Sequence, residues 1–310
     1  MAVMANRRQV IPTQLALGPF STEEGLASLT RGVLYGPSFD RVMRGVHECR
    51  EPLDVPRDHG DLMHAARLAL GEQAVFVGRS AAWALGSRLA SPRAPVDIRV
   101  STAHQKRCRP SVRVHHRELG PDEVVETDFG LATSPLRTAL DLACGAGREW
   151  AVAACDHLLR VTALDPAHVM AEAQRVRGRR GIRQARDVAA MLDPRSESPR
   201  ESLLRVHMLD FGLPRPTSQL VVLDPRGCFV GRLDFGWEEE RVGIEYDGDH
   251  HREVATHSRD LWRHNRLREL GWVVFQVDAH GLLAVDNTLA AVRSLLLSRR
   301  EGRSSGLGGV

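Results

Sequence analysis

Two neighbouring segments constrain the fold of this chain more than any other feature. Residues 228–235 and 241–247 both read as β-strands, because apolar and charged side chains alternate along them. Residues 236–240 form a short link between them, which predicts an antiparallel hairpin. In the register centred on this link, Asp234 lies directly opposite Glu245 on one face of the sheet.

The other face of the hairpin supports the same register. It pairs Phe235 with Ile244 and Leu233 with Tyr246, which are large and mostly apolar side chains. A sheet with one face in the core and one face toward solvent shows this alternation. The apolar pattern and the acidic pattern therefore predict the same pairing.

Facing carboxylates need a cation. Across an antiparallel pair, Asp234 and Glu245 would lie about 5 Å apart and repel each other. Mg²⁺ or Mn²⁺ suits such a place, because hard divalent cations bind carboxylate oxygens, activate water and neutralise charge on a phosphodiester. The alternative is an ion pair with Arg232 or Arg241 on a solvated face, and the residues alone leave both open.

Further acidic and imidazole groups lie close to this pair. Asp247, His250 and His251 follow the second strand in a turn, where an imidazole is a general base, a ligand or idle. Glu201 lies at the start of a predicted helix and has capping-box spacing from Ser198. Glu201 therefore either bonds back to the Ser198 amide or serves an ion through water.

The helix predicted after the turn is rich in arginine. Arg259, Arg263 and Arg266 are candidates for contacts with DNA, because a nucleic-acid backbone requires cations around an acidic metal centre. The alternative is a solvated helix whose arginines pair with Asp260 and Glu269.

The whole chain predicts an α/β fold, α+β overall, in several parts. Its strongest change of composition lies at residues 177–200, which are rich in Arg, Gly, Pro and Ser, and there we place a domain boundary. The first sixty residues carry short helical signals and predict either a helix-turn-helix or winged unit, or two surface helices packed on the next domain. The predicted parts are the unit 1–60, an α+β region 61–176, a basic linker 177–197, an α/β domain 198–300 and a disordered tail 301–310. Helical segments are predicted at 21–29, 38–44, 61–83, 135–143, 149–160, 166–176, 183–191, 199–211, 258–270 and 289–298, and strands at 96–100, 112–116, 124–127, 219–223, 228–235, 241–247 and 272–277.

Composition excludes several classes of protein. With 310 residues, 43% hydrophobic and 26% charged, the chain is long enough for about two domains and is neither collagen-like nor wholly disordered. Its 42 basic and 39 acidic residues are too evenly balanced for net charge to indicate a polyanionic partner. An apolar run long enough to span a membrane and a secretory signal are both missing from the sequence, which predicts a cytoplasmic protein without membrane contact.

The acidic hairpin and the segments after it form an ordered string that resembles a known family. The string is Asp234, the run 245–248 (Glu-Tyr-Asp-Gly), His250, Asp260, Arg263, Leu267 and the pair 271–272 (Gly-Trp). It is similar to the very-short-patch-repair-like endonuclease domains, a branch of the PD-(D/E)xK restriction-endonuclease-like superfamily, over about the last third of the chain. The resemblance implies a mixed sheet flanked by helices, with Asp234 and Glu245 as magnesium ligands. It also implies Glu201 as an outer acidic residue, and His250 or His251 near the attacking water.

The upstream part of the chain resembles a second family. Residues 78–83 (Gly-Arg-Ser-Ala-Ala-Trp) and 133–142 (Thr-Ser-Pro-Leu-Arg-Thr-Ala-Leu-Asp-Leu) are similar to the AbiEi-type antitoxin or transcriptional-regulator region. That resemblance implies a winged helix-turn-helix in the first sixty residues. It implies DNA, and a toxin or antitoxin, as partners.

One position departs from the superfamily pattern. Its third motif ends in a lysine two residues after the acidic ligand, whereas Asp247 stands here and no lysine follows Lys106. The repair-like branch uses histidine to activate water, a role open to His250 or His251. Gln276, in the last predicted strand, faces either the cleft or the sheet edge. The sequence therefore predicts a magnesium-dependent DNA endonuclease acting in repair or defence, and its alternative is a non-catalytic, antitoxin-like regulator that binds DNA.

Overall fold

The chain contains both helices and strands, as expected, and the strands of its described residues form three sheets. A computed structural model describes residues 11–50, 57–100, 111–145, 147–248 and 254–306, with 254–260 and 304–306 described by their backbone. Unit 1 consists of Met1–Leu142 with Val161–Leu164, and unit 2 of Ala143–Arg160 with Asp165–Val310. Among the helices of the described residues, none has the length and apolarity needed to cross a membrane.

The described part of unit 1 begins with three short helices and a small antiparallel sheet. Ser21 and Glu24 form the expected capping box: the Glu24 amide donates to Ser21 Oγ (3.1 Å) and the Ser21 amide to Glu24 Oε2 (2.6 Å). The helical segment expected at 38–44 is instead a strand, because its backbone pairs with the following strand. The elements are α1 (Thr13–Ala16), β1 (Phe20–Ser21), α2 (Thr22–Ser28), α3 (Arg31–Leu34), β2 (Phe39–Met43) and β3 (Val46–Cys49), with sheet order β1-β3-β2.

The rest of unit 1 is a five-stranded mixed sheet with helices. The helix expected over 61–83 is wrong, because α4 ends at Leu70 and a strand intervenes before α5. Gly71, at φ +93°, provides the break. The elements are α4 (His59–Leu70), β4 (Val75–Phe76), α5 (Gly78–Ala84), β5 (Val96–Arg99), β6 (Val112–Val114), β7 (Val124–Thr127), β8 (Gly130–Thr133) and α6 (Pro135–Ala143), with sheet order β6-β5-β4-β8-β7.

Four helices precede the sheet of unit 2, and a buried ion pair joins two of them. Asp156 on α7 and Arg205 on α10 contact each other with side chains only 1% exposed. The division of the chain near residue 142 therefore differs from the linker expected at 177–197, which contains a helix. These helices are α7 (Arg148–Thr162), α8 (Pro166–Arg175), α9 (Ile182–Met191) and α10 (Pro199–Asp210).

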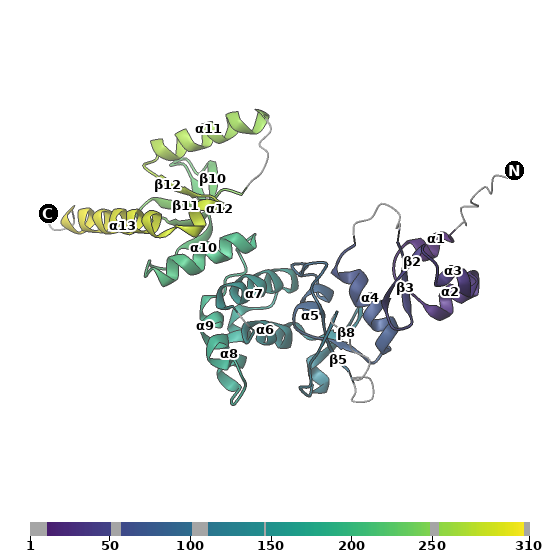
Figure 1. Ribbon diagram of the computed structural model, residues 1–310. Coiled ribbons are helices and arrows are strands. Elements are labelled where there is room, and N and C mark those ends of the chain that lie inside the picture. The colour runs from purple at the N-terminus through teal and green to yellow at the C-terminus, as the bar shows by residue number, and fades with distance from the viewer. Residues whose placement is uncertain (1–10, 51–56, 101–110, 146, 249–253, 307–310) are drawn as a thin grey trace. The chain divides into compact units, whose positions relative to one another are not determined.

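The sheet of unit 2 has helices on both faces (Figure 1). Its order is β12-β11-β10-β9, with β11 and β12 parallel and the other pairs antiparallel. One face packs on α10, α12 and α13, and the other on α11. The elements are β9 (Thr217–Leu223), β10 (Phe229–Trp237), β11 (Val242–Tyr246), α11 (Val254–Glu269), β12 (Val273–Val277), α12 (Ala279–Leu283) and α13 (Asp286–Gly306).

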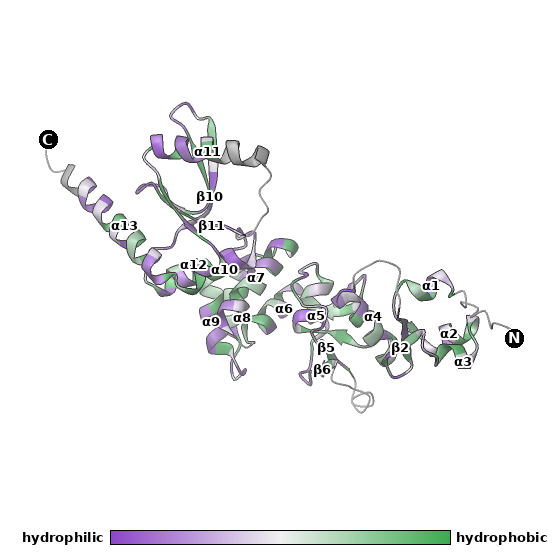
Figure 2. Ribbon diagram, turned by 45° about the horizontal axis from the view of Figure 1, so that its top comes forward, coloured by the Kyte–Doolittle hydropathy of each residue, from purple (hydrophilic) through white to green (hydrophobic). Residues whose placement is uncertain are grey.

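The last helix runs further than expected. Apolar and polar residues alternate along α13 (Figure 2), and Leu289, Val292 and Leu296 are buried at the spacing of one helix face. Residues 301–306 continue this helix, so most of the predicted disordered tail is helical.

Candidate functional site

The hairpin register predicted from the sequence is confirmed where the two strands pair. Phe235 lies opposite Ile244, and the pairing continues to Trp237 opposite Val242. The predicted pair of Leu233 and Tyr246 is wrong, because Leu233 packs on the α11 side of the sheet and Tyr246 on the other side. The ladder between β10 and β11 ends at Phe235 and Ile244. Asp234 and Glu245, the next residues away from the turn, are therefore not a ladder pair.

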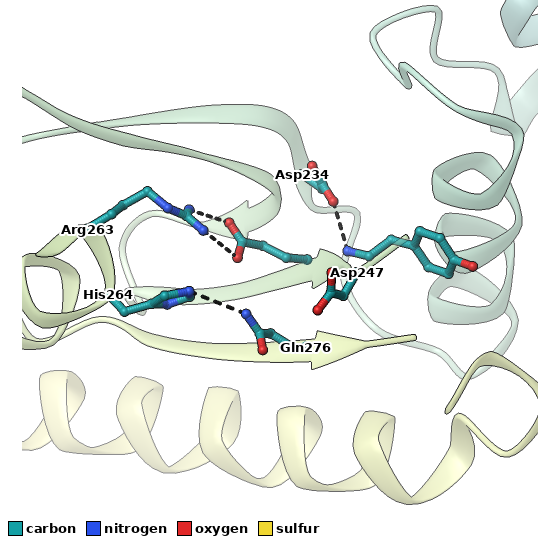
Figure 3. Close-up of a pocket in the computed structure, with 7 residues that line it drawn as sticks. Asp234, Asp247, Arg263, His264 and Gln276 are labelled. Atoms are coloured by element: carbon teal, nitrogen blue, oxygen red, sulfur yellow. Dashed lines mark hydrogen bonds and ion pairs between the residues drawn. The ribbon is translucent and has the colours of Figure 1, made fainter. Parts of the chain in front are cut away.

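Asp234 lies where the strands separate. Its Oδ2 accepts a hydrogen bond of 2.8 Å from the Tyr246 amide, in place of a backbone partner (Figure 3). Burial, and then the charges of Glu201 and Glu245, raise the pKa of Asp234 to about 7. Asp234 is therefore a carboxyl group close to other carboxylates and without a cation bound directly to it in the described structure.

Glu245 has a cation. Arg263 on α11 forms a two-bonded pair with it, from Nη1 to Oε1 at 2.6 Å and from Nη2 to Oε2 at 3.0 Å. The Glu245 side chain is 12% exposed and that of Arg263 23%. The ion-pair alternative is thus realised for Glu245, but by Arg263: Arg232 pairs with Glu197 (2.8 Å) and Arg241 donates to a backbone carbonyl.

Glu201 is buried at the start of α10, where it caps in a different way from the one expected. The Glu201 amide donates to Ser198 Oγ (3.2 Å), as predicted. Its carboxylate, however, accepts from the amide of Glu197 (2.8 Å) and from Gln219 Nε2 (2.9 Å) rather than from Ser198. The position is close enough to Asp234 for its charge to raise the pKa of that group.

The remaining predicted catalytic residues follow β11. The Asp247 amide donates to the Val277 carbonyl (2.9 Å), which extends the β11–β12 ladder by one residue, and Asp247 lines a pocket. His250 and His251 lie outside the described residues, as does the side chain of Arg259. Their assigned roles stay predictions.

The arginine helix meets the pocket at one turn. Arg266, expected to contact DNA, pairs with Glu269 (2.8 Å) and Asp224 (3.4 Å). His264 lies next to Arg263 in sequence and approaches Gln276, with 3.4 Å between His264 Nε2 and Gln276 Nε2. Gln276 therefore faces the cleft.

These groups surround one open pocket of about 190 Å³. His264 lies on the arginine-rich helix, but it was not among the candidate residues singled out from the sequence. The signal that could have identified it is the side-by-side placement of Arg263 and His264 on a helix that covers the acidic hairpin. The lining residues are Asp234, Glu245, Tyr246, Asp247, Arg263, His264 and Gln276 (Figure 3).

The pocket matches a divalent cation in ligand type. Asp234, Glu245 and Asp247 offer the carboxylate oxygens that Mg²⁺ and Mn²⁺ bind. A cation would also offset the burial and the neighbouring negative charges that raise the pKa of Asp234. Over the described ranges, no three His, Cys, Asp or Glu side chains already lie in the arrangement of a metal site. An ion would have to share Glu245 with Arg263 or take it from Arg263.

Comparison with known proteins identifies two mycobacterial relatives. No family model matches the chain, and no solved structure matches it. The uncharacterized protein Rv2248 of Mycobacterium tuberculosis (strain ATCC 25618 / H37Rv) is 32% identical over 256 residues, covering 81% of this chain and 89% of that protein. The uncharacterized protein MT2308 of Mycobacterium tuberculosis (strain CDC 1551 / Oshkosh) matches with the same identity and coverage. The matched stretch is longer than either unit, and the chain belongs to the family of these two mycobacterial proteins.

Proposed function

We propose that unit 2 is a restriction-endonuclease-like domain that hydrolyses phosphodiester bonds of DNA with Mg²⁺ or Mn²⁺. One observation carries the proposal: Asp234, Glu245 and Asp247 line a single open pocket at the point where the hairpin strands separate. The mixed sheet with helices on both faces supports the same assignment.

In this proposal each residue of the pocket has a separate role in metal binding or proton transfer. Asp234 and Glu245 would hold the ion, and Asp247 or Glu201 would add a second layer of negative charge. The ion, when bound, supplies charge stabilisation to the phosphodiester under attack. A histidine takes the proton from the attacking water: His250 or His251 by the sequence resemblance, or His264, which lines the pocket.

Cleavage by the Asp234→Asn variant tests this function. Asparagine keeps an oxygen to accept from the Tyr246 amide but loses the charge, so nicking of supercoiled plasmid in Mn²⁺ should fall about 100-fold. The matched control is Glu239→Gln, at the turn end of the same hairpin and 80% exposed, which should cleave like the unchanged protein. Equal nicking by the Asp234 variant would show that the assigned ligands are wrong.

A second candidate function is DNA binding without cleavage. Two observations favour it: Arg263 already neutralises Glu245, and Asp247 stands where a lysine is expected. The order of helices and strands in residues 13–49 is also compatible with a winged helix-turn-helix. A protein that shifts a promoter fragment in a gel and never cuts in Mg²⁺ or Mn²⁺ would establish this candidate instead of the first.

The Arg263→Gln variant is expected to bind Mn²⁺ more tightly. Because the guanidinium competes with the ion for both oxygens of Glu245, removing its charge should raise the affinity about tenfold. The shift of the melting temperature with Mn²⁺ concentration measures this affinity. Arg266→Gln, on the same helix but paired with Glu269 and Asp224, leaves Glu245 paired and is the control. Equal affinity in both variants would exclude competition by Arg263.

A further inference from the structure

Unit 1 contains a charged cluster that the proposed nuclease site does not use. Its centre is Asp97 on β5, with a side chain only 4% exposed. Asp97 Oδ1 lies 3.2 Å from Arg113 Nη1 and 3.0 Å from His115 Nε2, and its Oδ2 lies 3.3 Å from Arg79 Nε. We call these four residues the Asp97 cluster.

The backbone fixes the position of the central carboxylate. The Asp97 amide donates to the buried Ser80 Oγ (2.9 Å), and the Asp97 carbonyl accepts from the Val77 amide (3.0 Å). Arg113 lies directly opposite Asp97 in the parallel ladder of β5 and β6. Asp97 on β5 therefore holds Arg79 of α5 together with Arg113 and His115 of the β6 segment, which is how a preorganised binding site is built.

The cations of the cluster exceed its single carboxylate and reach solvent. The side chains of Arg79, Arg113 and His115 are 44%, 55% and 42% exposed. Burial acts to raise the pKa of Asp97, but the hydrogen bond from His115 and the two guanidinium charges outweigh it and hold that pKa below its usual value. Asp97 thus stays ionised, and its single negative charge is outnumbered by the two arginine charges, which leaves a net charge of about +1.

The donors left over suit an oxyanion. Only Nε of Arg79 and Nη1 of Arg113 approach the Asp97 carboxylate, so each guanidinium has other N–H groups beyond those that this carboxylate takes. Guanidinium forks match the oxygens of phosphate in geometry and charge. Asp97 would act here as a positioning residue that holds both forks at a fixed separation.

We propose that Arg79, Arg113 and His115 form a binding site for a phosphate group, presented by the DNA backbone or by a small phosphate compound. The site lies wholly within unit 1 and does not depend on cleavage by unit 2. An experiment with two arms distinguishes the DNA backbone from a small phosphate compound as the source of the phosphate group.

The first arm measures binding of the full chain to a short DNA duplex by fluorescence anisotropy, over a series of salt concentrations and without divalent ions. Arg79→Gln and Arg113→Gln should each weaken binding about five- to tenfold and reduce the salt slope by about one. Each single variant leaves Asp97 with another arginine and His115, which preserves folding. Arg175→Gln, which removes an exposed arginine paired with Glu172 on α8, outside the candidate winged unit, is the matched control and should change neither quantity.

The second arm measures the melting temperature of the full chain in inorganic phosphate against chloride at equal ionic strength. A site for phosphate gives the unchanged protein and Arg175→Gln a rise in melting temperature that Arg79→Gln and Arg113→Gln lack. Loss of DNA binding in the first arm identifies the DNA backbone as the source. A phosphate response without a change in DNA binding identifies a small phosphate compound. If Arg79→Gln and Arg113→Gln match the control in both arms, the proposal is overturned.

Discussion

Replacing Arg205 by methionine is expected to lower the free energy of unfolding of unit 2 by about 3–5 kcal/mol at pH 7. Arg205 and Asp156 are both 1% exposed, and Arg205 also donates to the Met191 carbonyl. Methionine fills much of the volume but leaves the Asp156 carboxylate buried without its cation. Amide hydrogen exchange in α10, followed by mass spectrometry, measures the loss without interference from unit 1.

The pH dependence of this loss gives a second readout. Burial raises the pKa of Asp156 to about 6, against the opposing charge of Arg205, so Asp156 is largely ionised at pH 7 and mostly neutral at pH 5. The penalty in Arg205→Met should therefore shrink toward pH 5. Arg148→Met removes an ion pair with the half-exposed Asp210 and should cost less than about 1 kcal/mol. Equal losses of unfolding free energy in the two variants would show that the buried pair contributes no more to stability than the exposed one.

The Asp234→Asn variant is expected to be more stable than the unchanged protein at pH 8. The pKa of Asp234 is raised by burial and neighbouring carboxylates to about 7, from about 4 in the unfolded chain. Because the folded state holds the proton more tightly, the stabilisation from this group is complete below pH 4 and is lost as the pH rises through 7. After allowance for partial exposure to solvent, the loss is about 2 kcal/mol at pH 8.

Melting temperatures of the Asp234→Asn variant and the unchanged protein between pH 4 and 8 measure this effect. The two curves should diverge as the pH rises, and Mn²⁺ should bring the unchanged protein back toward the variant at pH 8. Asp224→Asn is a control of opposite sign, because hydrogen bonds from the amides of Cys228 and Arg226 hold the pKa of Asp224 below its usual value. If the variant is no more stable than the unchanged protein at pH 8, the ionised Asp234 carboxylate does not destabilise the folded state.

Local patterns predicted much of unit 2. The pairing of Phe235 with Ile244 follows from the period-two alternation, because a one-residue slip would move every apolar side chain to the wrong face. The N-terminus of α10 follows from Ser198, whose side chain caps the helix. These features depend on residues close together in sequence, and the physical rules that govern them act locally.

Features that depend on distant residues were missed. The partner of Glu245 is Arg263, 18 residues away on a helix. Arg232 and Arg241, the candidates considered from the sequence, lie nearer on the same hairpin. The ion pair of Asp156 with Arg205 crosses the expected linker at a separation of 49 residues. Tertiary contacts of this kind decide which of several equally plausible arginines meets a carboxylate, and no periodicity in the sequence records that choice.

The hydrogen bond from the Tyr246 amide to Asp234 has a practical consequence for mutagenesis. The carboxylate accepts from an amide that would otherwise bond to the facing strand. Truncation of Asp234 to alanine would leave the Tyr246 amide without this acceptor, and the β10–β11 ladder could then extend by another hydrogen-bonded pair. Any loss of activity in an alanine variant would then come partly from a rearranged backbone, although it would be attributed to the missing carboxylate. Only a side chain of the same length and shape separates the two contributions.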